Sequence, residues 1–438
     1  MKLSAPVAKL VQQLSWLVAV IMVIIPFHAF MTVWLSSLIG HYTLLRLWKE
    51  FLLVPLLAAS AYLLIINKPL RRKLFGSWLV RSVGAYFLVL LVCSLGAWHG
   101  HAVATKAIWY GLLVDSRFLF FFLAAWIVAA NSDWLANRWQ KILLGPAIFV
   151  GAIAILQYLV LPYDFLKHFG YSQSTIYPYE TINHNLAHIR VLSTLRGANP
   201  LGAYLILPIS ALAVWLFREK RERRDKLVFG LGLLLALWFS FSRSAWLGAA
   251  IAILAAAWMT YKKETTRKTI SYILVGLVVL VAAAGLVLRN NLSIQDIVLH
   301  TDNNSTIKLS SNQGHSSAFK AAVKDIYHQP FGGGVGSAGP QSVYNNGHSR
   351  LAENYFLQIG QEAGVLGMIL FVAICAALGL GLYTRRSDPL ALTLLASLIG
   401  LSLVNLLSHA WSDDTLAYVY WGLAGVVLAP KLTKSKNT

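Results

Sequence analysis

Apolar segments alternate with short polar loops along most of the chain. Each apolar segment is about 20 residues long, enough for a helix to cross roughly 30 Å of hydrocarbon. Helices are the default because backbone groups in lipid must pair within their own segment. The pattern therefore predicts an all-α polytopic membrane protein with about 12 transmembrane helices. The predicted spans are 15–37, 50–66, 78–97, 107–130, 142–161, 201–217, 227–241, 245–260, 270–288, 353–382, 389–408 and 415–430.

One stretch departs from this alternation. Residues 289–352 form a long polar segment between two predicted spans, and it contains Asp, His, Arg and Asn residues and a Gly-rich turn. Crossing a bilayer does not require such a segment, and long loops between membrane helices are commonly functional. We expect one large extracytoplasmic loop within a single integral membrane domain over residues 1–438.

Basic residues gather in the loops on one side of the predicted spans. Because the number of spans is even, both termini lie on that side, which the positive-inside rule makes cytoplasmic. The basic loops and ends are Lys2 and Lys9, Lys68–Lys73, Arg138 and Lys141, Arg218–Lys226, Lys262–Lys268, Arg385 and Arg386, and Lys431–Lys436.

Composition agrees with a membrane protein. Only 12% of the residues are charged, about half the usual fraction in soluble domains, and the mean hydropathy is +0.62. The net charge of +20 does not indicate nucleic-acid binding, because it is spread over short loops that flank the membrane, where its partners are lipids. Cys93 and Cys375 both fall within predicted spans, so we expect neither a disulfide nor a metal site.

The first candidate site precedes the span at 201–217. Arg190 and Arg196 lie at the membrane boundary and are followed by Asn199, Pro200 and Gly202, which shape the start of a helix. Helix starts bind anions through free backbone N–H groups, and guanidinium groups bind phosphate through two parallel hydrogen bonds. The alternative is that both arginines extend to lipid phosphates at the interface.

A third arginine lies in a very short turn between two spans on the outer side. Arg243 is flanked by Ser242 and Ser244, in a position where basic residues are otherwise sparse. Because the turn is tight, the side chain cannot extend far into water. We expect it to point along the protein surface or into a cavity, rather than to lipid headgroups.

Polar residues also begin the span after the long loop. Asn354, Gln358, Gln361 and Glu362 fall on one helical face and are expected to line a wet cavity or to bond with neighbouring helices. His348 precedes this stripe and is a candidate base or acceptor-binding group, the alternative being a solvated loop histidine.

Two further patterns are less specific. The Gly-rich run Pro330–Gly336 is a weak phosphate-binding signal, because no lysine of the P-loop type follows it. Asp115 and Arg117 lie close together in a predicted span, where we expect them to neutralise each other, with Arg117 facing a cavity as the alternative.

The order of these motifs resembles the O-antigen ligase and O-antigen polymerase superfamily. The resemblance covers residues 185–380, whereas the preceding spans match only in number and topology. The residues that carry it are Arg190–Gly202, Ser242 and Arg243, Pro330–Gly336, His348–Gln358 and Glu362–Gly367.

The resemblance implies a GT-C-like membrane fold and an inverting, metal-independent glycosyltransferase of the bacterial cytoplasmic membrane that needs no cofactor. The implied donor is a glycan on undecaprenyl pyrophosphate, and the implied acceptor is a hydroxyl of a glycan or glycolipid at the outer face. By position, Arg190 and Arg243 would hold the donor pyrophosphate, with Arg196 as a third candidate. His348 would act on the acceptor hydroxyl, and Asn354 and Gln358 would line the acceptor side.

One departure from the family pattern affects the base. Many ligases have a histidine directly before the asparagine of this motif, whereas here Glu353 precedes Asn354 and the nearest histidine is His348. Either Glu353 takes the catalytic role, or the chain is a polymerase-type member with different acceptor chemistry. Both His348 and Glu353 are therefore candidate catalytic residues.

A flippase or transporter of lipid-linked sugar is the alternative from another class. A transporter predicts polar residues near the membrane midplane and internal symmetry. In this chain the polar residues gather in the outer half and no internal repeat is visible, which favours the enzyme. A non-catalytic scaffold would leave the placement of Arg190 and Arg243 unexplained.

Overall fold

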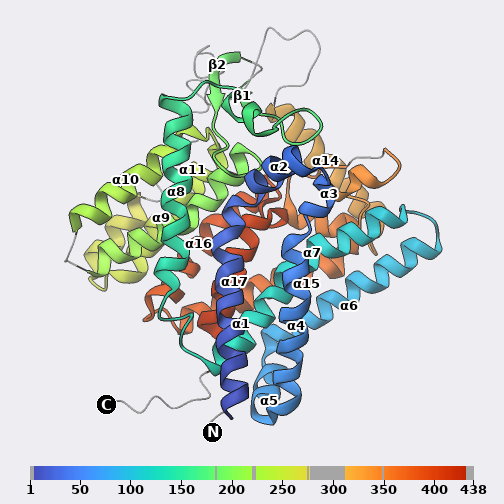
Figure 1. The fold of residues 1–438 in the computed structure, drawn as a ribbon, viewed down its shortest axis with the longest axis horizontal. Coiled ribbons are helices and arrows are strands. Elements are labelled where there is room, and N and C mark those ends of the chain that lie inside the picture. Colours follow the sequence, from blue (N-terminus) through green and yellow to red (C-terminus); the bar gives the residue numbers. More distant parts are fainter. Residues whose placement is uncertain are drawn as a thin grey trace.

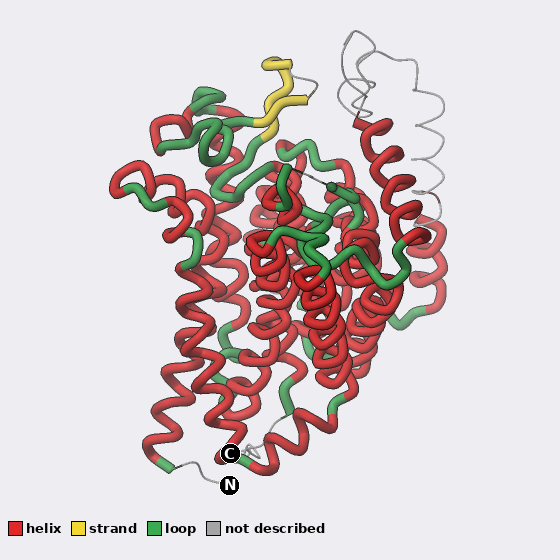
Figure 2. Tube along the Cα trace, turned by 90° about the vertical axis from the view of Figure 1, so that its right-hand side faces the viewer, coloured by secondary structure: helices red, strands yellow, loops and turns green. Residues whose placement is uncertain are grey.

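The computed structural model describes residues 4–182, 185–219, 223–273, 276, 311–347 and 350–430. These residues form a helical bundle with a small sheet at one end (Figures 1 and 2). The first half contains α1 (Ala5–Ile24), η1 (Ile25–Phe27), α2 (His28–Ile39), α3 (Tyr42–Leu45), α4 (Trp48–Ile66), α5 (Lys68–Gly76), α6 (Trp78–His99), α7 (Thr105–Asn131), α8 (Trp139–Leu159), η2 (Phe165–Phe169), β1 (Glu180–Ile182) and β2 (Asn185–Arg190). The second half contains α9 (Ala198–Arg218), α10 (Arg223–Phe239), α11 (Arg243–Thr260), α14 (Ser311–His328), η5 (Pro340–Tyr344), α15 (Tyr355–Thr384), α16 (Pro389–Leu407), η6 (Ala410–Ser412) and α17 (Asp414–Leu428).

The predicted polytopic membrane protein is confirmed. Within the described residues, 9 helical segments are long and apolar enough to cross a membrane. Two further predicted spans fold as the shorter helices α10, with 17 residues, and α17, with 15 residues. The predicted span 270–288 lies largely outside the described residues. The total of about 12 spans therefore stays a prediction.

The fold departs from the all-α expectation in one place. β1 and β2 pair in antiparallel fashion, with Glu180 opposite Arg190 and Thr181 opposite Ile189. In Figure 1 this sheet lies at the end of the molecule opposite to the start of α1 and the basic helix α5. The sheet brings opposite charges on its two strands face to face, a pairing that stabilises a short hairpin.

The short helix α17 lies at the centre of the bundle and packs along α7. Its side chains from Thr415 to Val426 are all buried, including those of Tyr418, Tyr420 and Trp421. A helix that is apolar on every side must be surrounded by other helices or by lipid. Here protein surrounds α17, so its 15 residues need not match the full thickness of the membrane.

The Gly-rich run fills a break in α15. Helical geometry is interrupted at Gly364, which has φ 70° and ψ −174°. Gly333 N donates to Gln361 O at 2.7 Å, Gly334 N donates to Glu362 O at 3.0 Å, and Val365 N donates to Pro330 O at 2.9 Å. The run thus supplies partners for backbone groups that the break leaves unpaired, as a buried environment requires.

Replacement of Gly332 by Ala should destabilise the protein strongly. Gly332 has φ +88°, and an added Cβ would lie 2.5 Å from Glu362 O, so the run could no longer fit the break. Gly347→Ala is the matched control, because Gly347 has φ +81° but an added Cβ would meet nothing within 4 Å. We expect Gly347→Ala to cost only the backbone strain of about 1 kcal/mol, and Gly332→Ala to cost more. Thermal unfolding in detergent measures both, and equal losses would contradict this role of the run.

Candidate functional site

Arg190 is fixed at the end of β2 by three contacts. Its Nε donates to Ser240 O at 3.1 Å, its Nη2 donates to Asn199 Oδ1 at 2.5 Å, and its Nη1 lies 3.3 Å from Glu180 Oε2. Its side chain is only 13% exposed. Burial lowers the pKa of the guanidinium, and the Glu180 carboxylate opposes this effect. Arg190 is therefore positioned by the protein rather than directed to lipid headgroups.

The same contacts bring Arg190 to the turn that carries Arg243. Val191 N donates to Phe239 O at 3.2 Å, so the end of β2 lies along the α10–α11 turn. The guanidinium groups of Arg190 and Arg243 are close enough for their charges to interact. Gly202 of α9 makes this arrangement possible, because a Cβ there would lie only 2.8 Å from the Cβ of Ser242. The two predicted arginines thus meet at one place.

A cavity of about 220 Å³ is lined by Glu180 and Asn199, two of the three residues that hold Arg190. We call it the Glu180 cavity. Across it, Arg196 Nε donates to Asp413 Oδ2 at 2.7 Å. Its lining residues are Glu180, Arg196, Gly197, Asn199, Pro200, Ala203, Ser408, His409, Ala410 and Asp413.

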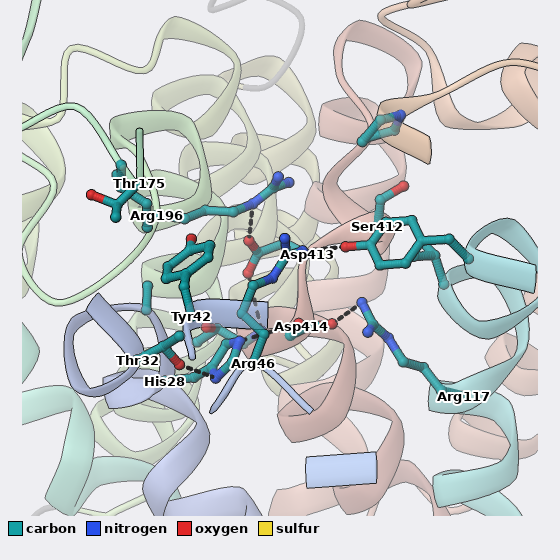
Figure 3. A pocket seen from close by; sticks show the side chains of 16 residues that line it. His28, Thr32, Tyr42, Arg46, Arg117, Thr175, Arg196, Ser412, Asp413 and Asp414 are labelled. Atoms are coloured by element: carbon teal, nitrogen blue, oxygen red, sulfur yellow. Dashed lines mark hydrogen bonds and ion pairs between the residues drawn. The ribbon is translucent and has the colours of Figure 1, made fainter. Parts of the chain in front are cut away.

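A second polar cavity, of about 380 Å³, lies next to the first and shares Arg196 and Asp413 with it. We call it the Arg46 cavity. Figure 3 shows Arg196 reaching Asp413 and Arg117 reaching Asp414. Its lining residues are His28, Ala29, Thr32, Tyr42, Arg46, Tyr110, Val114, Arg117, Thr175, Ile176, Arg196, Pro340, Ser412, Asp413, Asp414 and Thr415.

Residues 227–372 match the O-antigen ligase family model. This part of the chain is similar to the O-antigen ligase family, and the resemblance seen in the motifs is confirmed. No curated protein matches the chain. The matched region contains Arg243, the Gly-rich run and the start of α15, whereas Arg190 and Arg196 precede it.

The residues predicted to form the acceptor side do not gather at one place in the structure. His348 lies outside the described residues. Glu353 has φ +51°, and its charge acts on His409 of the loop between α16 and α17. Asn354 caps α15: its Oδ1 accepts from Leu357 N at 3.0 Å and its Nδ2 donates to Leu406 O at 3.0 Å. Of the described residues in this group, only Glu353 interacts with a residue that lines the Glu180 cavity, namely His409.

The rest of the polar stripe bonds to other segments of the O-antigen ligase region. Gln358 is buried against Gly339. Gln361 Nε2 donates to Asp325 Oδ2 of α14 at 2.8 Å. Glu362 Oε1 accepts from Gly336 N at 2.7 Å and from Gln341 Nε2 at 2.8 Å. These contacts join α15 to α14 and to residues 336–341, and none of the three side chains lines either cavity.

The expected mutual neutralisation of Asp115 and Arg117 is wrong. Residues two apart on a helix point in different directions. Arg117 Nη1 lies 2.8 Å from Glu50 Oε1, and Nη2 pairs with Asp414, so Arg117 faces the Arg46 cavity. Asp115 instead accepts from Gln341 Nε2 at 3.4 Å, on the side of α15.

His409 is a cavity residue that the sequence motifs did not identify. It lies in the loop between α16 and α17, outside the region that matches the family model. Burial and the charge of Arg196 lower the pKa of His409 to about 4, and the charge of Glu353 opposes them. The imidazole is therefore neutral near pH 7 and able to accept a proton. The available signal was a histidine in the short loop between the last two predicted spans.

Buried charges beneath the Arg46 cavity compensate one another. Lys49, whose side chain is 2% exposed, has its Nζ 3.2 Å from Glu50 Oε2 and 3.2 Å from Asp414 Oδ2. Arg117 pairs with the same two carboxylates. Buried ions persist only when they are paired in this way. The network joins α4, α7 and α17 under the cavity.

Lys49→Met should therefore destabilise the protein by about 3–5 kcal/mol, because it leaves two carboxylates with one fewer cation in a buried site. Thermal unfolding in detergent measures the loss. Lys141→Met is the control, since Lys141 is exposed. Similar unfolding temperatures for the two variants would rule out the network as a structural requirement.

Proposed function

We propose that this protein transfers a glycan from a polyprenyl pyrophosphate to a hydroxyl of a glycan or glycolipid acceptor, at the outer face of the bacterial cytoplasmic membrane. The family match supports the coarser activity, that of a ligase or polymerase. The observation that carries the finer proposal is the meeting of Arg190 and Arg243 beside the polar Glu180 cavity.

The donor side of this reaction needs fixed positive charge. When the bond between the anomeric carbon and the phosphate oxygen breaks, its electron pair stays on the pyrophosphate. Guanidinium groups that are already in place stabilise this developing charge without reorganising. Arg190 meets that condition through its contacts with Ser240, Asn199 and Glu180, and Arg243 adds a second cation at the same place.

The acceptor side needs a proton acceptor. The acceptor oxygen attacks the anomeric carbon from the face opposite the leaving pyrophosphate, which inverts the configuration, and the hydroxyl proton passes to a base. His348 and Glu353 are the candidates from the motif. His409 adds a neutral imidazole that lines the Glu180 cavity and interacts with Glu353. In this proposal Glu353 stabilises the imidazolium that forms on His409, so an imidazole from another loop replaces the histidine missing beside Asn354.

Arg190→Gln and Arg243→Gln should each lower kcat by about 10²–10³-fold, as expected when one group that stabilises transition-state charge is lost. The assay uses the purified protein in lipid nanodiscs with lipid-linked oligosaccharide, acceptor and a chelator. Arg138→Gln is the matched control, because Arg138 is an exposed arginine that stacks on Trp134.

Full transfer by both variants would refute the proposed donor site. Translocation of the lipid-linked sugar across proteoliposomes without bond formation would instead support a flippase. Donor supplied without a separate acceptor distinguishes the two enzymes, since a polymerase lengthens the glycan under those conditions and a ligase does not.

The pH dependence of kcat/KM tests the base. With a pKa of about 4, His409 is neutral and active above this pH and protonated below it. We expect kcat/KM to stay level from pH 8 to pH 5 and to fall below about pH 5, because this parameter reports the free enzyme. His409→Gln should lower kcat by about 10²–10⁴-fold and remove the acid limb. If His348→Gln instead abolishes the fall of kcat/KM at low pH, and His409→Gln retains it, the base is His348.

A further inference from the structure

Arg46 lies between α3 and α4, where tyrosine rings surround its guanidinium. The guanidinium carbon is 5.8 Å from the ring centroid of Tyr42 and 5.6 Å from that of Tyr110. Its Nη2 also donates to the hydroxyl of Tyr110. Tyr344 extends this cluster by packing edge-on against Tyr110, with their ring centroids 5.1 Å apart. Arg46 and the rings of Tyr42 and Tyr110 all line the Arg46 cavity.

Arg46 differs from the other cations of the cavity in its partners. Arg196 pairs with Asp413, and Arg117 pairs with Glu50 and Asp414. Lys49 beneath the cavity shares those last two carboxylates. Among the residues that the structure describes, Arg46 has no carboxylate within ion-pair distance. The four cations therefore face three carboxylates, and the remaining positive charge is that of Arg46.

The cavity offers three kinds of contact to a ligand. Tyrosine rings provide flat faces for the C–H surface of a sugar, and the polar side chains of the lining can bond with its hydroxyl groups. The guanidinium of Arg46 suits a carboxylate or phosphate through two parallel hydrogen bonds. The volume of about 380 Å³ lies in the range of small-molecule sites.

We propose that the Arg46 cavity is a subsite for an anionic sugar residue of the acceptor, one that carries a carboxylate or a phosphate. Arg46 holds the anionic group, and Tyr42 and Tyr110 hold the ring. This inference rests on the proposed function for its assignment to the acceptor.

The arrangement of the two cavities assigns the Arg46 cavity to the acceptor rather than to the donor. Glu180 and Asn199, two of the three residues that fix Arg190 on the donor side, line the Glu180 cavity. The Arg46 cavity meets that cavity at Arg196 and Asp413. A transferase must bring two sugars together at one reacting carbon, so it needs adjoining pockets on either side of that point. Arg196 and Asp413 mark the junction.

Binding can be tested without any transfer reaction. The full-length protein in phosphatidylcholine nanodiscs is titrated with methyl glucuronide, which carries a carboxylate, and with the neutral methyl glucoside. We expect the charged glycoside to bind more tightly to the wild type. Arg46→Gln should weaken its binding at least tenfold, about 1.4 kcal/mol, and leave the glucoside unchanged. Tyr42→Ala should weaken both glycosides, because it removes a stacking face.

Three controls keep the result specific. Arg138→Gln, the arginine stacked on Trp134, should bind both glycosides as the wild type does. Arg46→Lys should restore part of the affinity for the charged glycoside, since it keeps the charge but loses the paired donors. Thermal unfolding of each variant shows whether it is folded.

Several outcomes would overturn the proposal. These are equal binding of the charged glycoside to Arg46→Gln and wild type, inorganic phosphate binding as tightly as the glycoside, and displacement of the glycoside by phosphatidylglycerol, which would indicate a headgroup site. In the transfer assay, the charged glycoside should compete with the acceptor, and competition with the donor would reject the acceptor assignment. If no transfer occurs at all, the proposed function fails, while the binding titration still decides whether Arg46 holds an anionic sugar.

Discussion

Every polar group buried within this bundle needs a partner from the protein, because neither lipid nor a packed interior supplies one. The contacts of α15 follow from that requirement. Where its helical geometry breaks at Gly364, the Gly-rich run supplies hydrogen bonds to the carbonyls of Gln361 and Glu362. Under the Arg46 cavity, Lys49 and Arg117 share their carboxylate partners. The break in α15 and the buried cations are thus both compensated by segments distant in the chain.

The same requirement fixes Arg190 at the end of the bundle that carries the small sheet. Arg190 is held by a strand, a turn and a helix start, so its guanidinium is oriented before any ligand arrives. Preorganisation of this kind is what a charged leaving group requires. The pair Arg196 and Asp413 then separates two polar cavities that differ in lining, one beside Arg190 and one beside Arg46.

Parts of the site followed from sequence because they depend on local chemistry. A common role for Arg190 and Arg243 could be predicted from the order of the family motifs, and the tight turn at Ser242 limits the reach of Arg243. The partners of Asp115 and Arg117 were not accessible, because each lies on a different helix far along the chain. His409 was missed for the same reason: only packing brings its loop to the Glu180 cavity.

The sequence by itself determined the membrane class, most of the helical spans and the resemblance to the O-antigen ligase family. These depend on the length and hydrophobicity of contiguous segments and on the order of motifs, all of which are local or linear properties. The tertiary structure decided how the Gly-rich run is used, which carboxylates pair with which cations, and that Arg46 faces a cavity without a carboxylate partner among the described residues. Those outcomes depend on contacts between helices distant in the chain, and hydrophobic periodicity carries no information about which buried charges will meet.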